Sequence, residues 1–118
     1  MTTQLDLAIA HILRSGSAEA KIGVLTGMGE IAIAQSYADL VEDVARAKYH
    51  HDKHPTRPAT AEDRANSLFD LDTVPVDQEE YNRLFVAWGE ASAALSAMDA
   101  KLREMADERT ADHDYAPS

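Results

Sequence analysis

The histidines of residues 49–54 have the spacing best suited to metal chemistry. His50 and His54 are four residues apart and His51 and His54 three apart, so either pair can share one face of a helix. A second histidine follows His50 where a zinc-protease helix carries its glutamate base, and a lysine interrupts the group. We therefore expect the three histidines to complement the negative end of a helix, with a structural zinc or nickel site as the alternative.

Three glycines in residues 23–29 form the next candidate site. The order Gly23-x-x-x-Gly27-x-Gly29 lacks the Lys-Ser/Thr pair of a phosphate-binding loop and the order of a dinucleotide fingerprint. A turn, or close packing of a helix through small residues, explains these glycines better than a bound nucleotide. A small ligand held at Gly27 and Gly29 is the alternative.

Paired carboxylates give little support for catalysis. Glu42-Asp43 and Glu79-Glu80 are adjacent in sequence, so their side chains point in different directions on a helix and favour a solvated surface over acid–base chemistry. The chain has no cysteine, which excludes thiolate nucleophiles and disulfides. We expect no enzymatic activity and no cofactor.

The negative charge of the chain is concentrated in two segments. Residues 62–80 carry seven acids against one arginine, and residues 104–114 carry five against one. Acids and bases balance elsewhere, so the formal charge of −10 belongs to these segments. Such a field attracts basic partners and repels nucleic acid and anionic membranes. We predict a partner-binding surface made of the seven acids of the first segment: Glu62, Asp63, Asp70, Asp72, Asp77, Glu79 and Glu80.

The size of the chain, 118 residues, is typical of one domain. Only seven residues are aromatic, so we expect a thin core that a second subunit stabilises. No apolar run approaches the ~20 residues of a membrane helix, and the first residues lack the pattern of a signal peptide, which predicts a cytoplasmic protein. We expect one helical domain over residues 1–108 and a disordered acidic tail over 109–118.

Hydrophobic spacing and capping residues predict four helices, over residues 4–14, 36–53, 60–71 and 78–108. Thr3, Thr60 and Asp77 are the expected N-caps, and the capping-box pattern at Ser36 means either that a helix starts there or that an earlier one continues. The prolines of residues 55–59 and 72–76 predict a linker and a turn. The predicted fold class is mostly α: a small helical bundle or hairpin with one long, heptad-patterned C-terminal helix.

Residues 18–35 fit two structures. Ile31 and Ile33 alternate with small neighbours, as in a short strand after a glycine turn. Ile22, Leu25 and Gly29 instead begin a helical stripe that runs into the next segment. We favour the helix, and an α+β fold with a β-hairpin at about residues 21–34 is the alternative.

The C-terminal helix carries an unbroken 3-4 spacing from Tyr81 to Met105, the pattern of a coiled-coil seam. Its first half is expected to pack on the 36–53 helix, and its second half to project and meet another copy or partner. Coverage of the whole seam by the chain itself is the equal alternative. The expected oligomer seam consists of Trp88, Leu95, Met98, Leu102 and Met105.

Charge and helical pattern together predict a non-enzymatic, acidic protein-binding module that forms a homo-oligomer. It would act as an inhibitor or neutralising partner that occupies a basic surface, as phage antagonists of host defence and bacterial immunity proteins do as classes. Alternative functions are an oligomeric assembly module and a small-ligand or metal-binding protein.

Overall fold

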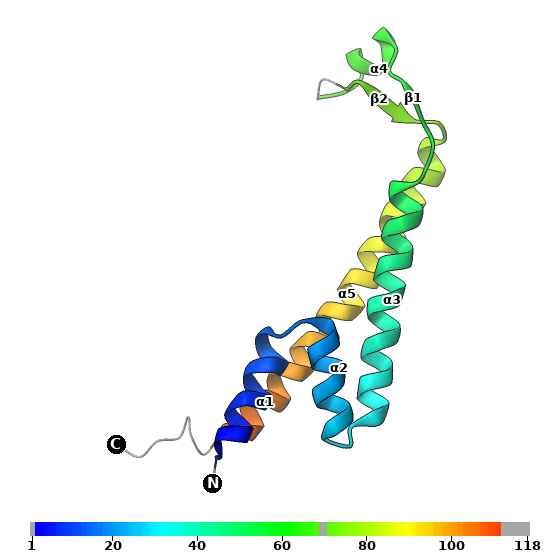
Figure 1. Ribbon diagram of the computed structural model, residues 1–118. Coiled ribbons are helices and arrows are strands. Elements are labelled where there is room, and N and C mark those ends of the chain that lie inside the picture. The colour runs from blue at the N-terminus through cyan, green and yellow to red at the C-terminus, as the bar shows by residue number, and fades with distance from the viewer. Residues whose placement is uncertain (1, 69–70, 112–118) are drawn as a thin grey trace.

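The computed structural model describes residues 2–68 and 71–111, which form five helices and two short strands in an elongated molecule (Figure 1). In chain order the elements are α1 (Gln4–Ser15), α2 (Ala18–Gly27), α3 (Ile31–Asp52), β1 (Thr56–Pro58), α4 (Ala61–Ala65), β2 (Thr73–Pro75) and α5 (Gln78–Arg109). The mostly α fold with one long C-terminal helix is confirmed. None of the described helices combines the length and hydropathy that a membrane span requires.

Side-chain caps start α1, α4 and α5 where the sequence predicts them. Thr3 and Thr60 each accept a hydrogen bond from the backbone N–H three residues on, and the acid at that position bonds back to the cap. Asp77 caps α5 in the same way, through its side chain alone. Ser36 is no cap, because it lies inside α3, which already begins at Ile31. The apolar stripe thus extends the helix past a cap-like sequence.

Residues 18–35 contain the whole of α2 and the start of α3, so the β-hairpin alternative at 21–34 is wrong. A turn separates α2 from α3 at Gly29, which has a φ of 84°. Glycine adopts this left-handed conformation without steric cost. The turn breaks the single stripe expected from the sequence and folds α2 back against α3.

The two N-terminal helices and the adjoining ends of α3 and α5 form the base of the molecule. α1 packs on α5, and α2 packs on α3 (Figure 1). All the buried hydrophobic residues of the described ranges lie here, and three of them are alanines that contribute little burial energy. They are Ala10, Leu13, Leu25, Ala34, Tyr37, Leu102 and Ala106.

A charged network joins three helices of the base. The ammonium of Lys21 donates a hydrogen bond to Asp99 Oδ1 at 3.0 Å, and the hydroxyl of Tyr37 donates to the same oxygen at 3.0 Å. Burial alone lowers the pKa of Lys21, but the hydrogen bond to Asp99 and the nearby charges outweigh it and raise the pKa. Burial, followed by the bond to Asp99, raises the pKa of Tyr37.

Beyond the base, α3 and α5 continue as a two-helix arm, residues 42–52 and 78–94 (Figure 1). The radius of gyration is 20.8 Å, against about 13.5 Å for a compact chain of this length. No side chain of the arm is buried. The buried residues nearest to the arm are Tyr37 on α3 and Leu102 on α5. Two helices shield only their facing sides, which leaves the arm without a closed core.

A small sheet and α4 complete the far end of the arm, which we call the tip, residues 53–68 and 71–77. β1 and β2 pair antiparallel, with Arg57 opposite Val74. The sequence analysis treated both segments as connections, and it was wrong because proline is tolerated in edge strands of this kind. α4 also ends at Ala65, short of the predicted Leu71.

The second half of the α5 seam is covered by the chain itself. Leu102 is fully buried, and Leu95, Met98 and Met105 pack against the base core. The expectation that this half projects was therefore wrong, because α1 lies on it. Trp88 lies farther out, in the arm, and is half-buried. Of the expected C-terminal tail, residues 112–118 lie outside the described ranges.

Candidate functional site

Six of the seven acids predicted to bind a partner lie on the tip and the first turn of α5, and Asp70 lies outside the described residues. Four of the six are exposed, and for three of these four no hydrogen bond or ion pair from a described residue satisfies the carboxylate. These three are Glu62, Asp72 and Glu79. Carboxylates in this state are available to a cation supplied from outside the chain.

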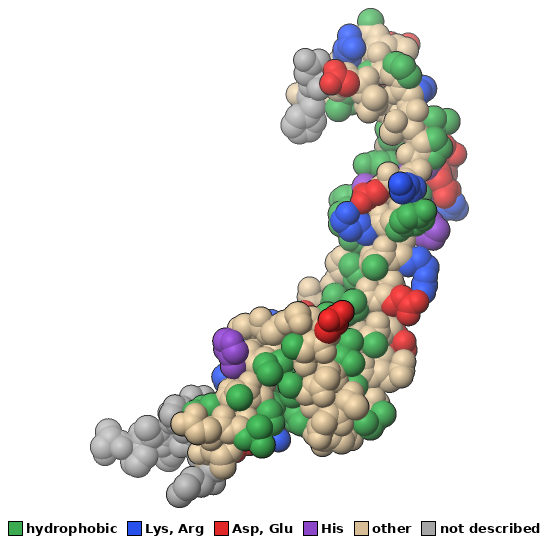
Figure 2. All heavy atoms as spheres, in the orientation of Figure 1, with side chains coloured by type: hydrophobic (Ala, Val, Ile, Leu, Met, Phe, Trp, Pro, Cys, Tyr) green, Lys and Arg blue, Asp and Glu red, His purple; other side chains and the backbone are tan. Residues whose placement is uncertain are grey.

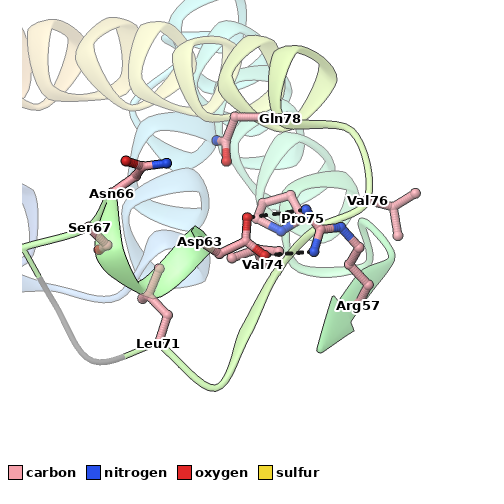
Figure 3. Close-up of a pocket in the computed structure, with 9 residues that line it drawn as sticks. All are labelled: Arg57, Asp63, Asn66, Ser67, Leu71, Val74, Pro75, Val76 and Gln78. Carbon is pink, nitrogen blue, oxygen red and sulfur yellow. Dashed lines mark hydrogen bonds and ion pairs between the residues drawn. The ribbon is translucent and has the colours of Figure 1, made fainter. Parts of the chain in front are cut away.

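Asp63 is instead used inside the tip. Its Oδ2 accepts hydrogen bonds from Arg57 Nη1 and from the backbone N–H of Thr60, each at 2.8 Å, and Figure 3 shows the pairing with Arg57. These bonds, first of all the one from Arg57, hold the pKa of Asp63 well below its ordinary value. Asp63 therefore stabilises the tip and is not part of the exposed acidic set.

The groove beside this ion pair has a volume of about 460 Å³ (Figure 3). It lies between the short helix α4 and β2, and its wall combines the Arg57–Asp63 pair with amide, hydroxyl and aliphatic groups. Its two charged residues neutralise each other, so the groove offers no excess charge to an ion. The other lining residues are Asn66, Ser67, Leu71, Val74, Pro75, Val76 and Gln78.

A second groove, of about 330 Å³, lies at the start of α5 and is acidic. It is lined by three acids and one base: Asp77, Glu79, Glu80 and Arg83. Asp77 accepts the backbone N–H of Glu80 as a helix cap, and Glu80 forms an ion pair with Arg83. Glu79 has no such partner and adds an uncompensated charge. The groove therefore suits a lysine or arginine side chain better than a phosphate.

The three candidate metal ligands do not converge. His50 is exposed, with its ring against Tyr49, whereas His54 accepts a hydrogen bond from the backbone N–H of Asp77 at 3.4 Å. Nowhere in residues 2–68 and 71–111 do three His, Cys, Asp or Glu side chains come together as a metal site would require. The metal-binding function thus gains no geometric support.

His51 belongs to an aromatic cluster that the sequence analysis missed. Its ring centroid lies 4.6 Å from Tyr81, 5.7 Å from Phe85 and 5.2 Å from Trp88. Its Nδ1 lies 3.2 Å from Asp52 Oδ1, and its buried Nε2 has no hydrogen-bond partner among the residues that the structure describes. The 3-4 spacing of the three aromatics on α5 was visible in the sequence, but it did not show that a histidine faces them.

The glycine segment is part of the base and no phosphate loop. Gly23 and Gly27 lie in α2, and the backbone N–H of Gly29 donates to the carbonyl of Thr26 at 3.1 Å. A loop that holds phosphate directs its backbone N–H groups at the ligand. Here the turn uses its N–H groups to close the end of α2.

Comparison with protein-family models, with curated protein sequences and with solved structures gives no match for this chain.

Proposed function

We propose that this protein is a non-enzymatic protein-binding module whose tip docks on a basic surface of another protein. The observation that carries this proposal is the set of three exposed carboxylates without an internal partner, Glu62, Asp72 and Glu79, at the end of a projecting arm. Each would gain a charge-assisted hydrogen bond from a lysine or arginine of the partner. Folding already satisfies Asp63, so its removal would weaken the tip without deleting a partner contact.

The shape of the molecule supports the same function. The arm holds the tip away from the base, as Figure 1 shows. The tip can therefore reach into a concave basic surface, whereas a compact acidic protein would only lie over it. The formal charge of −10 accelerates the encounter with a basic partner and disfavours nucleic acid. An inhibitor that blocks a nucleic-acid-binding surface would use both properties.

Charge reversal of the three unsatisfied acids tests the proposal. The variant Glu62→Lys, Asp72→Lys, Glu79→Lys changes the formal charge by +6 and removes no internal contact of the described residues. We expect it to keep the helicity of the wild type and to lose the partners that wild-type protein captures from an extract of its native host, as read by mass spectrometry. Rim charges act mainly on the association rate, so capture should also weaken steeply with salt.

A matched control reverses three exposed acids of the base, Glu19, Glu104 and Glu108, which also lack a partner among the described residues. This variant has the same net charge as the tip variant and should retain the captured partners. If both triple variants capture the same partners as the wild type, the acidic tip is not the binding surface.

A further inference from the structure

The outer side of α5 in the arm is almost free of charge. Between Arg83 and Asp99, fifteen residues contain one charged side chain, Glu90. Over the arm, α3 instead carries ion pairs between residues three or four apart, which involve Arg46 and Lys48. Two large apolar residues of α5 are also exposed, Phe85 by 57% and Val86 by 55%. Figure 2 shows hydrophobic side chains reaching the surface along the arm.

Six residues of α5 form one stripe, because their successive spacings are 4, 3, 4, 3 and 4. We call these residues the outer stripe: Gln78, Asn82, Phe85, Gly89, Ser92 and Ser96. A groove of about 210 Å³ lies within it, lined by Phe85, Trp88, Gly89 and Ser92. These four lie at i, i+3, i+4 and i+7, the spacing of the hole that receives one side chain of a facing helix in knobs-into-holes packing.

Gly89 has no role inside its own chain that would require glycine. A Cβ atom placed there would meet no atom within 4 Å, and the residue lies inside a helix. Glycine in a helix interior costs about 1 kcal/mol relative to alanine. A residue without a side chain lets another backbone approach closely. Gly89 therefore leaves room for the backbone of another helix to approach α5 closely.

The outer stripe is symmetric about Ala87. In an antiparallel pair of α5 helices centred there, each stripe residue of one copy faces a different stripe residue of the other. The facing pairs are Phe85 with Gly89, Asn82 with Ser92, and Gln78 with Ser96. The largest residue meets the smallest, each amide meets a hydroxyl, and no charge enters the contact. Such a pairing is self-complementary, as a two-fold interface requires.

The exposed area of the elongated chain is also large enough for an interface with a second copy. The chain exposes 8203 Å², whereas a compact protein of this mass exposes about 6,300 Å². A standard interface removes about 800 Å² from each partner, well within this excess. The two-helix arm has no buried side chain, and two arms side by side would cover part of the surface that each leaves exposed.

From these observations we propose that the outer stripe binds a second copy of this chain, with the two α5 helices antiparallel and Phe85 of each copy seated over Gly89 of the other. This contact is independent of the proposed tip function, since it uses none of the tip acids. The two proposals can fail separately.

The first test places a charge in the hole. Light scattering after size exclusion should give wild-type protein twice the mass of one chain, and Gly89→Glu the mass of one chain with unchanged helicity. Gly23→Glu is the matched control, because Gly23 also lies in a helix with no atom within 4 Å of a built Cβ. It should remain a dimer. A wild type with the mass of one chain, or a dimeric Gly89→Glu, would overturn the proposal.

Cross-linking tests the register of the two α5 helices. It gives an answer even if a single chain does not stay folded on its own. The chain lacks cysteine, so single cysteines can be introduced and treated with a short bismaleimide. In an antiparallel pair centred at Ala87, the two Cα atoms of Gly89→Cys are separated by about 6 Å along the helix axes. The two Cα atoms of Ala100→Cys are separated by about 39 Å. We expect covalent dimers from the first variant only. Equal cross-linking of both variants would indicate parallel helices, and no cross-linking with Gly89→Cys would overturn the proposed contact.

Discussion

The packing of the base is restricted by a network of three polar side chains, Lys21, Tyr37 and Asp99. One carboxylate oxygen accepts from an ammonium of α2 and a hydroxyl of α3, so the three helices must meet in one arrangement to satisfy it. A buried charge without its partner is costly, which disfavours every other packing. Sequence analysis could not find this network, because Lys21 and Asp99 are 78 residues apart and neither belongs to a local motif.

The network predicts a loss of stability at alkaline pH. The folded-state pKa values of Lys21 and Tyr37 lie above their ordinary values of 10.5 and 10.0. Groups with raised pKa values stabilise the fold fully below the unfolded pKa and lose that contribution as the pH rises through the folded pKa. The free energy of unfolding, measured with urea, should therefore be level from about pH 7 to pH 9 and fall above about pH 10.

Two tyrosine variants separate this network from general alkaline effects. Tyr37→Phe removes a hydrogen bond to a carboxylate and should cost about 1–2 kcal/mol at neutral pH, with a smaller further loss above pH 10. Tyr49→Phe changes an exposed ring and should stay within about 0.5 kcal/mol of the wild type at every pH. If both variants follow the wild-type pH profile, the network does not contribute.

At the scale of elements, local chemistry predicted helix starts and failed where tertiary contacts decide. The caps at Thr3, Thr60 and Asp77 were predicted because a cap needs only residues three apart. Ser36 has the same local pattern but lies within α3, whose apolar stripe continues through it. β1 and β2 have few cues of their own, since strand pairing depends on the arm that brings their ends together.

Asp63 is the residue whose removal should loosen the tip alone. Asp63→Ala loses both the α4 capping box and the bonds to Arg57, while the base keeps every contact. Hydrogen exchange should therefore accelerate at the N–H groups of Ala59 and Val76, which close the sheet at its two ends. Helicity should remain close to the wild-type value, since α4 has five residues.

The neighbouring acid provides the control for this prediction. Glu62→Ala removes an exposed carboxylate without an internal partner and should leave both N–H groups as protected as in the wild type. Equal protection in Asp63→Ala and Glu62→Ala would show that the Arg57–Asp63 pair does not hold the tip.

At the scale of the molecule, stability is distributed unevenly. The buried residues cluster in the base, and the arm and tip depend on half-buried side chains and exposed backbone hydrogen bonds. The heptad pattern predicted the length of α5 to within one residue, since it depends on the seam alone. It could not predict which half is covered, because α1 reaches the seam through packing that has no signature in the seam itself.

This distribution gives the last prediction, which concerns hydrogen exchange along α5. In the isolated chain, protection should be highest around Leu102, which is fully buried, and fall toward Trp88 and the tip. If the outer stripe binds a second copy, mass action should slow exchange around Trp88 when the protein concentration rises by about 100-fold. Exchange around Leu102 should change far less, because the contacts that bury it lie within its own chain. Exchange around Trp88 that is equal at both concentrations would argue against a second copy on the outer stripe.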